Sequence, residues 1–322
     1  MKIAFVGKGG SGKTTLSSLV ARHLAGQGHT VLALDADINQ HLAVALGLDE
    51  HLAASIPTLG DHLDLIKDYL RGDNPRIPSA REMVKTTPPG HGSRLLTITG
   101  PSPIHERLCV DAAGVRLMVT GAFTEEDLGV ACYHSKVGAV ELLLNHLVDG
   151  PSEHVVVDMT AGADAFASGL FTRFDRTFLV AEPTRKGVAV HEQYRRYAAD
   201  HGIPISVIGN KVHDERDVAF LRDHVGDDLL VHLEQSAAVR AQEQGSPAGA
   251  VVLEPANLAA LDRIVAAIEG TERDWDRLHR QMIEFHVKNA RSWANDAVGT
   301  DLSHQVDPDF RLDTRAALTA AL

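Results

Sequence analysis

Short runs of Val, Ile and Leu recur along the chain and alternate with longer stretches in which apolar residues return every three or four positions. The short runs are nearly continuous in apolar residues, which is typical of strands buried on both faces of a sheet. The longer stretches have the spacing of amphipathic helices. Strands are expected at residues 2–6, 30–35, 94–98, 115–119, 154–158, 177–181, 204–210 and 229–231. Helices are expected at residues 13–27, 136–148, 186–199, 214–225, 235–244 and 257–268.

This alternation predicts an α/β fold, a doubly wound and mostly parallel sheet flanked by helices. Two regions depart from it. Residues 71–93 are rich in proline and glycine without any periodicity, which predicts a surface insertion. After residue 270 the alternation stops, and helices are expected at 274–294 and, more weakly, at 313–322. The expected organisation is a single domain of residues 1–269 followed by a helical C-terminal extension, 270–322.

The charge balance limits the classes of partner. The chain has 31 basic and 43 acidic residues and a formal net charge of −12, which disfavours broad binding to nucleic acid or anionic lipid. No apolar run approaches the roughly 20 residues of a membrane span. Only two cysteines occur, Cys109 and Cys132, and the first residues lack signal-peptide anatomy. We therefore expect a cytoplasmic protein with reduced thiols and no membrane partner.

A glycine-rich loop follows the first expected strand and precedes the first expected helix. Residues 7–14 read GKGGSGKT and match the pattern G-x-x-x-x-G-K-[ST]. The glycines allow turns that bring successive backbone N–H groups close to phosphate oxygens. Lys13 is expected to reach the β- and γ-phosphates, and the Thr14 hydroxyl to ligate Mg²⁺. The residues predicted to hold the phosphates are Gly9, Gly10, Ser11, Gly12, Lys13, Thr14 and Thr15. The motif predicts a P-loop NTPase domain.

Lys8 adds a second cation to this loop. One phosphate site rarely needs two lysines. The side chain is either a solvated loop lysine or a catalytic cation that points away from its own loop, toward phosphates held by a second subunit. We favour the second interpretation, which predicts a homodimer.

The segment Lys8-Gly9-Gly10-x-Gly12-Lys13-Thr14 resembles the deviant Walker A loop of the MinD/ParA class of ATPases, which includes the nitrogenase iron protein. Further stretches resemble the CooC type, the nickel-insertion ATPases of carbon monoxide dehydrogenase. These stretches are residues 31–48, 155–169, 178–188, 207–215 and 228–247. The resemblance covers about residues 1–265. It implies ATP hydrolysis, a homodimer that forms on ATP, and a client metalloenzyme.

The resemblance assigns roles to three aspartates that follow expected strands. Asp37 would orient or activate the water that attacks the γ-phosphate. Asp35 would support the Mg²⁺ shell, and Asp158 would hold Mg²⁺ through water. Each could instead be a helix cap or turn residue. The family's proline after the second aspartate is Ile38 here, and residues 160–162 would form a mobile loop that senses the γ-phosphate.

Asn210 and Lys211 follow the strand expected at 204–210. In the family this asparagine reads the adenine edge and the next cation covers the ring, and a carboxamide supplies the donor and acceptor that adenine requires. GTP-binding loops usually read Asn-Lys-x-Asp, whereas here the aspartate is Asp214, one residue too late. We therefore expect ATP.

The family's C-x-C metal pair is altered here to Cys132-Tyr133-His134. A thiolate and an imidazole from each of two subunits would give four ligands for Zn²⁺ or Ni²⁺. The alternative is that the metal site is lost and Cys132 packs at a subunit contact.

The function we predict is an ATPase that dimerises on ATP and drives maturation of, or metal delivery to, a client metalloenzyme. One alternative is a partitioning or positioning ATPase like ParA and MinD, against which the net charge of −12 stands. Another is a nucleotide-sensing regulatory protein without cargo, which intact Lys13, Thr14, Asp37 and Asp158 disfavour.

Overall fold

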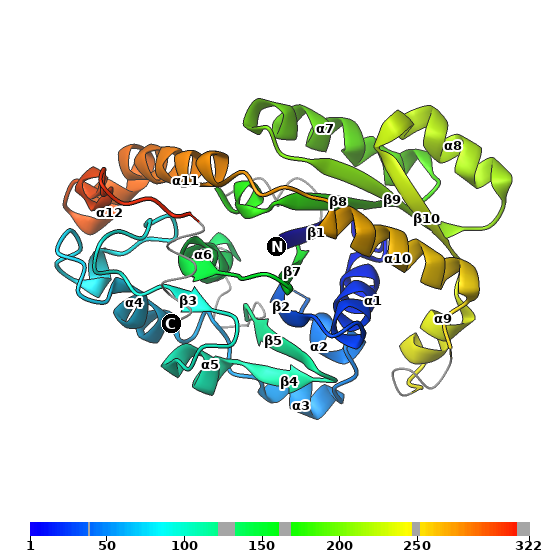
Figure 1. The fold of residues 1–322 in the computed structure, drawn as a ribbon, viewed down its shortest axis with the longest axis horizontal. Coiled ribbons are helices and arrows are strands. Elements are labelled where there is room, and N and C mark those ends of the chain that lie inside the picture. Colours follow the sequence, from blue (N-terminus) through cyan, green and yellow to red (C-terminus); the bar gives the residue numbers. More distant parts are fainter. Residues whose placement is uncertain (38, 122–132, 161–168, 247–251, 314–322) are drawn as a thin grey trace.

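The structure is a computed structural model that describes residues 1–322 except 38, 122–132, 161–168, 247–251 and 314–322. Its centre is a sheet of eight strands in the order β10-β9-β8-β1-β7-β2-β5-β4 (Figure 1). Neighbouring strands run parallel except β4 and β5. The strands are β1 (Lys2–Gly7), β2 (Thr30–Ala36), β4 (Val110–Ala112), β5 (Val115–Val119), β7 (Glu153–Met159), β8 (Arg176–Ala181), β9 (Ile205–Val212) and β10 (Leu229–Glu234). The predicted doubly wound α/β fold is confirmed.

Helices cover both faces of this sheet. One face packs against α1 (Lys13–Gly26), α2 (Leu42–Ala45), α3 (Glu50–Ser55) and α10 (Pro255–Glu269). The other packs against α4 (Leu63–Arg71), α5 (Pro103–Leu108), α6 (Tyr133–His146), α7 (Arg185–His201) and α8 (Glu215–Val225). A further helix, α9 (Ala237–Glu243), precedes α10. Among the described residues, none of the helices combines the length and the apolar character that crossing a bilayer requires.

Side-chain alternation along the strands explains the two cores. In β1, Ile3 and Phe5 belong to the core on the α1 side, whereas Ala4 and Val6 belong to the core on the α6 side. Successive side chains of a strand point to opposite faces, so a strand covered on both sides must be apolar throughout. This requirement produces the continuous apolar runs in the sequence.

The structure corrects the prediction of a strand at 94–98 in the central sheet. Only β3 (Leu96–Thr97) forms there, and it pairs with β6 (Leu147–Val148) in a separate sheet rather than with the central one. The edge of the central sheet is taken by β4, which folds back antiparallel onto β5 through the turn at Ala113 and Gly114. Because Leu147 and Val148 form β6, the helix expected at 136–148 ends at His146, two residues before the predicted end.

The segment 71–93, predicted as a surface insertion, is exposed in part and buried in part. The segment is irregular apart from a short turn, but Thr86 and Thr87 are fully buried. Thr87 donates a hydrogen bond to Gln305 Oε1 (2.9 Å), and Thr86 Oγ1 lies 3.3 Å from His286 Nδ1. The C-terminal extension therefore covers this segment and satisfies its polar groups.

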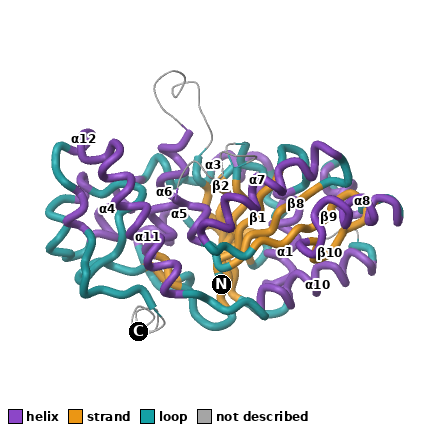
Figure 2. The backbone as a smooth tube through the Cα atoms, turned by 90° about the horizontal axis from the view of Figure 1, so that it is seen from above, coloured by secondary structure: helices purple, strands orange, loops and turns teal. Residues whose placement is uncertain are grey.

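The extension begins as the sequence predicts and continues further. The helix α11 (Trp275–Asn289) passes into a π-helical turn (Ala290–Ala294) and then into α12 (Asn295–Val298). Figure 2 shows α11, α12 and α4 at one end of the molecule and α8 at the other. The helix expected at 313–322 lies outside the described residues beyond Asp313, and the domain boundary at residue 269 stays a prediction.

Candidate active site

The glycine-rich loop lies between the end of β1 and the start of α1. It closes on itself where the Ser11 amide donates to the Lys8 carbonyl (3.1 Å). Gly12 is the residue before α1, and no side chain caps the helix. The first amides of α1 are thus free to bind an anion. Lys13 is buried, with 5% exposure, whereas Lys8 is exposed. The loop therefore places its two cations in different environments.

Gly12 fits this loop for two reasons. Its φ is +94°, in the left-handed region, and a Cβ built there would lie 2.2 Å from Asn210 Nδ2. We expect Gly12→Ala to weaken ATP binding at least about tenfold, since the loop must move to relieve the clash and the strained φ costs about 1–3 kcal/mol. Gly10→Ala is the matched control, because Gly10 also has a positive φ, +81°, but open space around its Cβ. Titration calorimetry with ATP should separate the two variants, and equal affinities would contradict this packing.

Thr14 and Asp158 form the cation end of the site. Thr14 Oγ1 donates a hydrogen bond of 2.6 Å to Asp158 Oδ2. The other carboxylate oxygen, Asp158 Oδ1, is buried and has no hydrogen-bond partner among the described residues. An unsatisfied buried carboxylate oxygen beside a hydroxyl is a donor set that suits Mg²⁺, which prefers oxygen ligands. Thr14 and Asp158 therefore fit the predicted Mg²⁺ site, in which Asp158 Oδ1 would be the ligand atom.

Burial and neighbouring charge raise the pKa of the carboxyl groups here. Burial raises the pKa of Asp158 to about 7, with Asp37 adding to the rise and Thr14 and Lys13 opposing it. Asp35 lies beside Asp158 on the adjacent strand, and burial and the Asp158 charge raise the pKa of Asp35 well above its ordinary value. A cation at this point would restore both carboxylates to their charged form.

Asp158 should therefore destabilise the metal-free protein at neutral pH. The folded state holds a proton on this carboxyl up to about pH 7, whereas its ordinary pKa is 3.8. The free energy of unfolding therefore falls as the pH rises from 3.8 to about 7, and it stays lower above that range. Asp158→Asn keeps an acceptor for Thr14, so at alkaline pH it should raise the free energy of unfolding by up to about 4 kcal/mol. Urea unfolding in chelator at several pH values checks this, and a difference that does not change with pH would refute it.

Asp35 and Asp37 lie at the end of β2. Both oxygens of Asp35 accept backbone amides, from Asp37 (3.2 Å) and Leu42 (2.9 Å), so this buried side chain holds the loop that follows β2. Asp37 Oδ2 lies 3.8 Å from Lys13 Nζ. Its Oδ1 accepts the Asn39 backbone amide (3.1 Å) and side-chain amide (3.0 Å). Asn39, which sequence reasoning missed, therefore orients Asp37 toward the loop.

Asn210 and Lys211 both contact the back of the glycine-rich loop. Asn210 Nδ2 donates to the Ser11 carbonyl (2.7 Å), and Lys211 Nζ donates to the Gly10 carbonyl (2.8 Å). Lys211 also pairs with Glu182 (2.6 Å), a residue that follows β8 and that the sequence analysis did not single out. The structure thus places Asn210 and Lys211 against the glycine-rich loop, and the adenine-reading role expected for Asn210 stays a prediction.

Some predicted residues fall outside the described part of the chain. Cys132, Ile38 and residues 161–162 lie there, and His134 is described only as part of the first turn of α6. Within the described residues, no three His, Cys, Asp or Glu side chains gather as metal ligands. The transition-metal pair at Cys132 and His134 stays a prediction.

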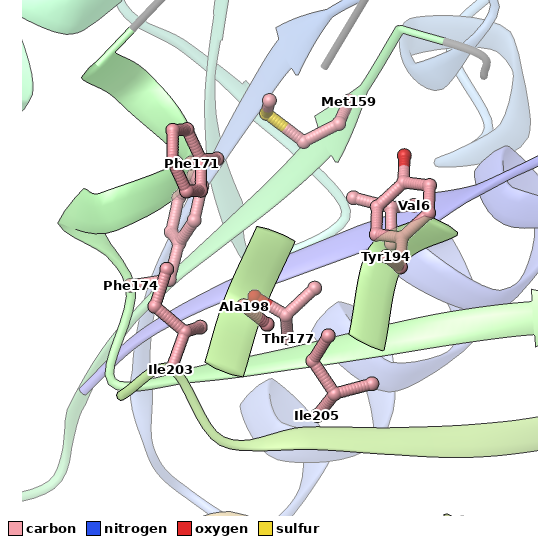
Figure 3. A pocket seen from close by; sticks show the side chains of 9 residues that line it. All are labelled: Val6, Met159, Phe171, Phe174, Thr177, Tyr194, Ala198, Ile203 and Ile205. Carbon is pink, nitrogen blue, oxygen red and sulfur yellow. The ribbon is translucent and has the colours of Figure 1, made fainter. Parts of the chain in front are cut away.

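A separate apolar cavity lies on the other side of β1, between the sheet and α7 (Figure 3). Its volume is about 10 Å³, room for about one water molecule. It is lined by Val6, Met159, Phe171, Phe174, Thr177, Tyr194, Ala198, Ile203 and Ile205. The size and apolar lining are those of a packing defect, so the nucleotide belongs at the glycine-rich loop.

Comparisons with known sequences agree with this geometry. Residues 3–289 match the CobQ/CobB/MinD/ParA nucleotide binding domain, and this match runs through α11, beyond the end of the resemblance at residue 265. The carbon monoxide dehydrogenase accessory protein CooC of Rhodospirillum rubrum is 33% identical over 247 residues, 76% of this chain and 87% of that protein. An uncharacterised ATP-binding protein of Methanocaldococcus jannaschii is 30% identical over 230 residues, 71% of this chain and 81% of that protein.

Solved structures show the same fold at low sequence identity. The cell division ATPase MinD of Pyrococcus furiosus has a TM-score of 0.55 and 19% identity, and the alignment covers 84% of this chain and 98% of that one. A putative plasmid partition protein of Borrelia burgdorferi, bound to AMPPNP, has a TM-score of 0.55 and 13% identity over 83% of this chain and 98% of that one.

Proposed function

Because this chain belongs to the CobQ/CobB/MinD/ParA nucleotide-binding family, we propose that it dimerises on ATP and uses hydrolysis to mature a client metalloenzyme or deliver a metal to it. The chain is an ATPase of the MinD/ParA class. The observation that carries the proposal is the likeness to CooC, an accessory protein of a metalloenzyme, at 33% identity. The P-loop, the Thr14–Asp158 pair and Asp37 support the ATPase part of it.

Each side chain of the site has a task in phosphoryl transfer to water. Lys13 and the loop amides bind the phosphates, while Asn210 fastens the loop that presents those amides. Thr14 and Asp158 would hold Mg²⁺, which supplies charge neutralisation when bound. Asp37, oriented by Asn39, would accept a hydrogen bond from the attacking water and direct it at the γ-phosphorus. Positioning and electrostatic stabilisation then account for the rate.

Lys8 would act on the phosphates of the partner subunit. It is exposed, and no described residue bonds its ammonium, so the side chain is available to a second chain. Mixing Lys8→Ala with Asp37→Ala protein tests this, because a mixed dimer then has one complete site, with Asp37 from one chain and Lys8 from the other. Phosphate release should recover to about a quarter of the wild-type rate, since about half of the dimers are mixed. If Lys8 acted within its own chain, mixing would restore nothing.

The cargo proposal concerns Cys132 and His134. One thiolate and one imidazole from each subunit would bind Zn²⁺ or Ni²⁺ at the two-fold axis as a tetrahedral set. Metal affinity should therefore rise when ATP holds the dimer together. Titration of each metal into ATP-bound Asp37→Ala protein, beside the same protein carrying Cys132→Ala, measures this. Uptake below one ion per dimer, or uptake indifferent to Cys132, would remove the metal cargo from the proposal.

The client can be sought directly. Purifying the native protein and analysing its metal content together with bound partners should yield a metalloenzyme, and that enzyme should change the rate of phosphate release. A copurifying enzyme without a metal centre, or turnover unaffected by any partner, would favour a different use of the ATPase.

A further inference from the structure

A second cavity is lined by residues of α4 and α12, among others. These two helices lie at one end of the molecule, away from the glycine-rich loop (Figure 1). Its volume is about 440 Å³, within the range of small-molecule sites. Its walls come from α4, the segment 81–85, α6 and the C-terminal extension. They consist of Leu63, Lys67, Arg81, Met83, Val84, Lys85, Gly138, Trp293 and Val298. None of these residues belongs to the ATPase site described above.

The cavity is cationic in a chain whose net charge is −12. Lys67, Arg81 and Lys85 line it, and none of the described residues of its lining carries a carboxylate. Among the described residues, none of the three cations forms an ion pair. Burial lowers the pKa of Lys67 below its ordinary value, with only Asp64 opposing the shift. The Lys67 charge is therefore partly desolvated, with Asp64 nearby but not in an ion pair with it.

The floor and one wall of the cavity are apolar. Met83 is fully buried and Val84 is 8% exposed, whereas Trp293 keeps 45% of its surface exposed. The Trp293 indole is nevertheless oriented, because its Nε1 donates to Asn289 Oδ1 (2.9 Å). Trp293 also belongs to the π-helical turn Ala290–Ala294, a feature that occurs frequently at functional sites. An oriented and exposed indole is a ready stacking surface.

The lysine at the mouth is positioned by α6. A Cβ at Gly138 would lie 3.1 Å from the Lys85 Cβ, so the absence of a side chain at 138 lets the stem of Lys85 lie against the helix. The aliphatic stem of Lys85 therefore packs on α6.

We propose that this cavity binds an organic anion, with its apolar body on Leu63, Trp293 and Val298 and its negatively charged head between Lys67 and Lys85. A carboxylate, sulfonate or phosphate head would supply a counter-charge, and an acyl or aryl body would cover the exposed apolar surface. The inference does not depend on the proposed client or cargo, because none of these residues contacts the nucleotide loop.

The test uses anilinonaphthalene sulfonate, an aryl anion whose fluorescence rises in apolar sites, with the full-length protein. Energy transfer from tryptophan to the bound probe should fall far more in Trp293→Phe than in Trp275→Phe, since Trp293 lines the cavity and Trp275 does not. Octanoate should displace the probe, whereas uncharged octanamide, which has the same chain, should displace it at least about tenfold less well.

Variants that remove positive charge from the cavity provide a second test. Lys67→Gln with Lys85→Gln keeps most of the side-chain bulk and should weaken probe binding about tenfold, while Arg222→Gln, an exposed cation of α8 at the other end of the molecule, should not. Transfer that falls equally in the two tryptophan variants, or octanamide as effective as octanoate, would overturn the proposal. The octanoate comparison needs only wild-type protein, so it decides the matter even if the double variant fails to fold.

Discussion

Lys13→Ala is expected to lose ATP binding and, with it, all turnover. The Lys13 ammonium is buried at the P-loop and lies 3.8 Å from Asp37. Removing it takes away the main positive charge for the β- and γ-phosphates and leaves Asp37 without its nearest cation. Losing one partner of a buried charge pair costs about 2–5 kcal/mol, so affinity for ATP should fall by more than about 30-fold.

Calorimetric titration with ATP and Mg²⁺ measures this loss. Arg222→Gln is the control, because it also removes one positive charge but lies on the exposed face of α8. Unfolding curves without nucleotide establish that both variants fold. If Lys13→Ala bound ATP within a few-fold of wild type, the phosphates would not lie on this loop.

Asp37→Asn is expected to separate binding from hydrolysis. The substitution keeps the shape of the side chain and its contact with Asn39, but an uncharged amide is a poor acceptor for the proton of an attacking water. Turnover should fall by about 10²–10⁴-fold, the usual contribution of a positioned general base, while ATP stays bound within a few-fold of wild type. The bound ATP should then persist for many times the wild-type turnover time.

Single-turnover hydrolysis and filter binding of labelled ATP distinguish the two steps. Asn39→Ala, which removes one of the two hydrogen bonds to Asp37 Oδ1, should give a smaller loss of rate with unchanged ATP affinity. Hydrolysis by Asp37→Asn at the wild-type rate would show that another group directs the water.

The central fold could be predicted because its signals are local. The strand β7 appears in the sequence as the apolar run before Asp158, and the glycine-rich loop is continuous in sequence between β1 and α1. Both features depend on residues next to one another, so the order of the chain contains them. The parallel pairing of β1 with β7 and β8 follows from the alternation of strands and helices.

The burial of part of the segment 71–93 could not be predicted in this way. Proline and glycine correctly indicated an irregular segment, but whether such a segment meets water depends on what covers it. Here the covering contact joins Thr87 to Gln305, which are 218 positions apart. No local pattern in either segment indicates that pairing.

The site residues also divide into those with a local sequence signal and those without one. Lys13, Thr14 and Asp158 were found from a motif and from strand ends, and the structure brings them together. Asn39 and Glu182 were missed, because a residue that orients another has no sequence pattern of its own. Their only signal was position, since both directly follow strands whose carboxyl ends meet at the nucleotide loop.

The proposed role of Lys8 requires an ATP-bound state that joins two chains across their P-loops. Sedimentation velocity of Asp37→Asn protein, in which ATP should remain intact, tests this directly. With ATP and Mg²⁺ the protein should sediment as a dimer, with ADP as a monomer, and Lys13→Ala should stay monomeric with either nucleotide. A species of one chain in saturating ATP would contradict the composite site and leave Lys8 without its proposed role.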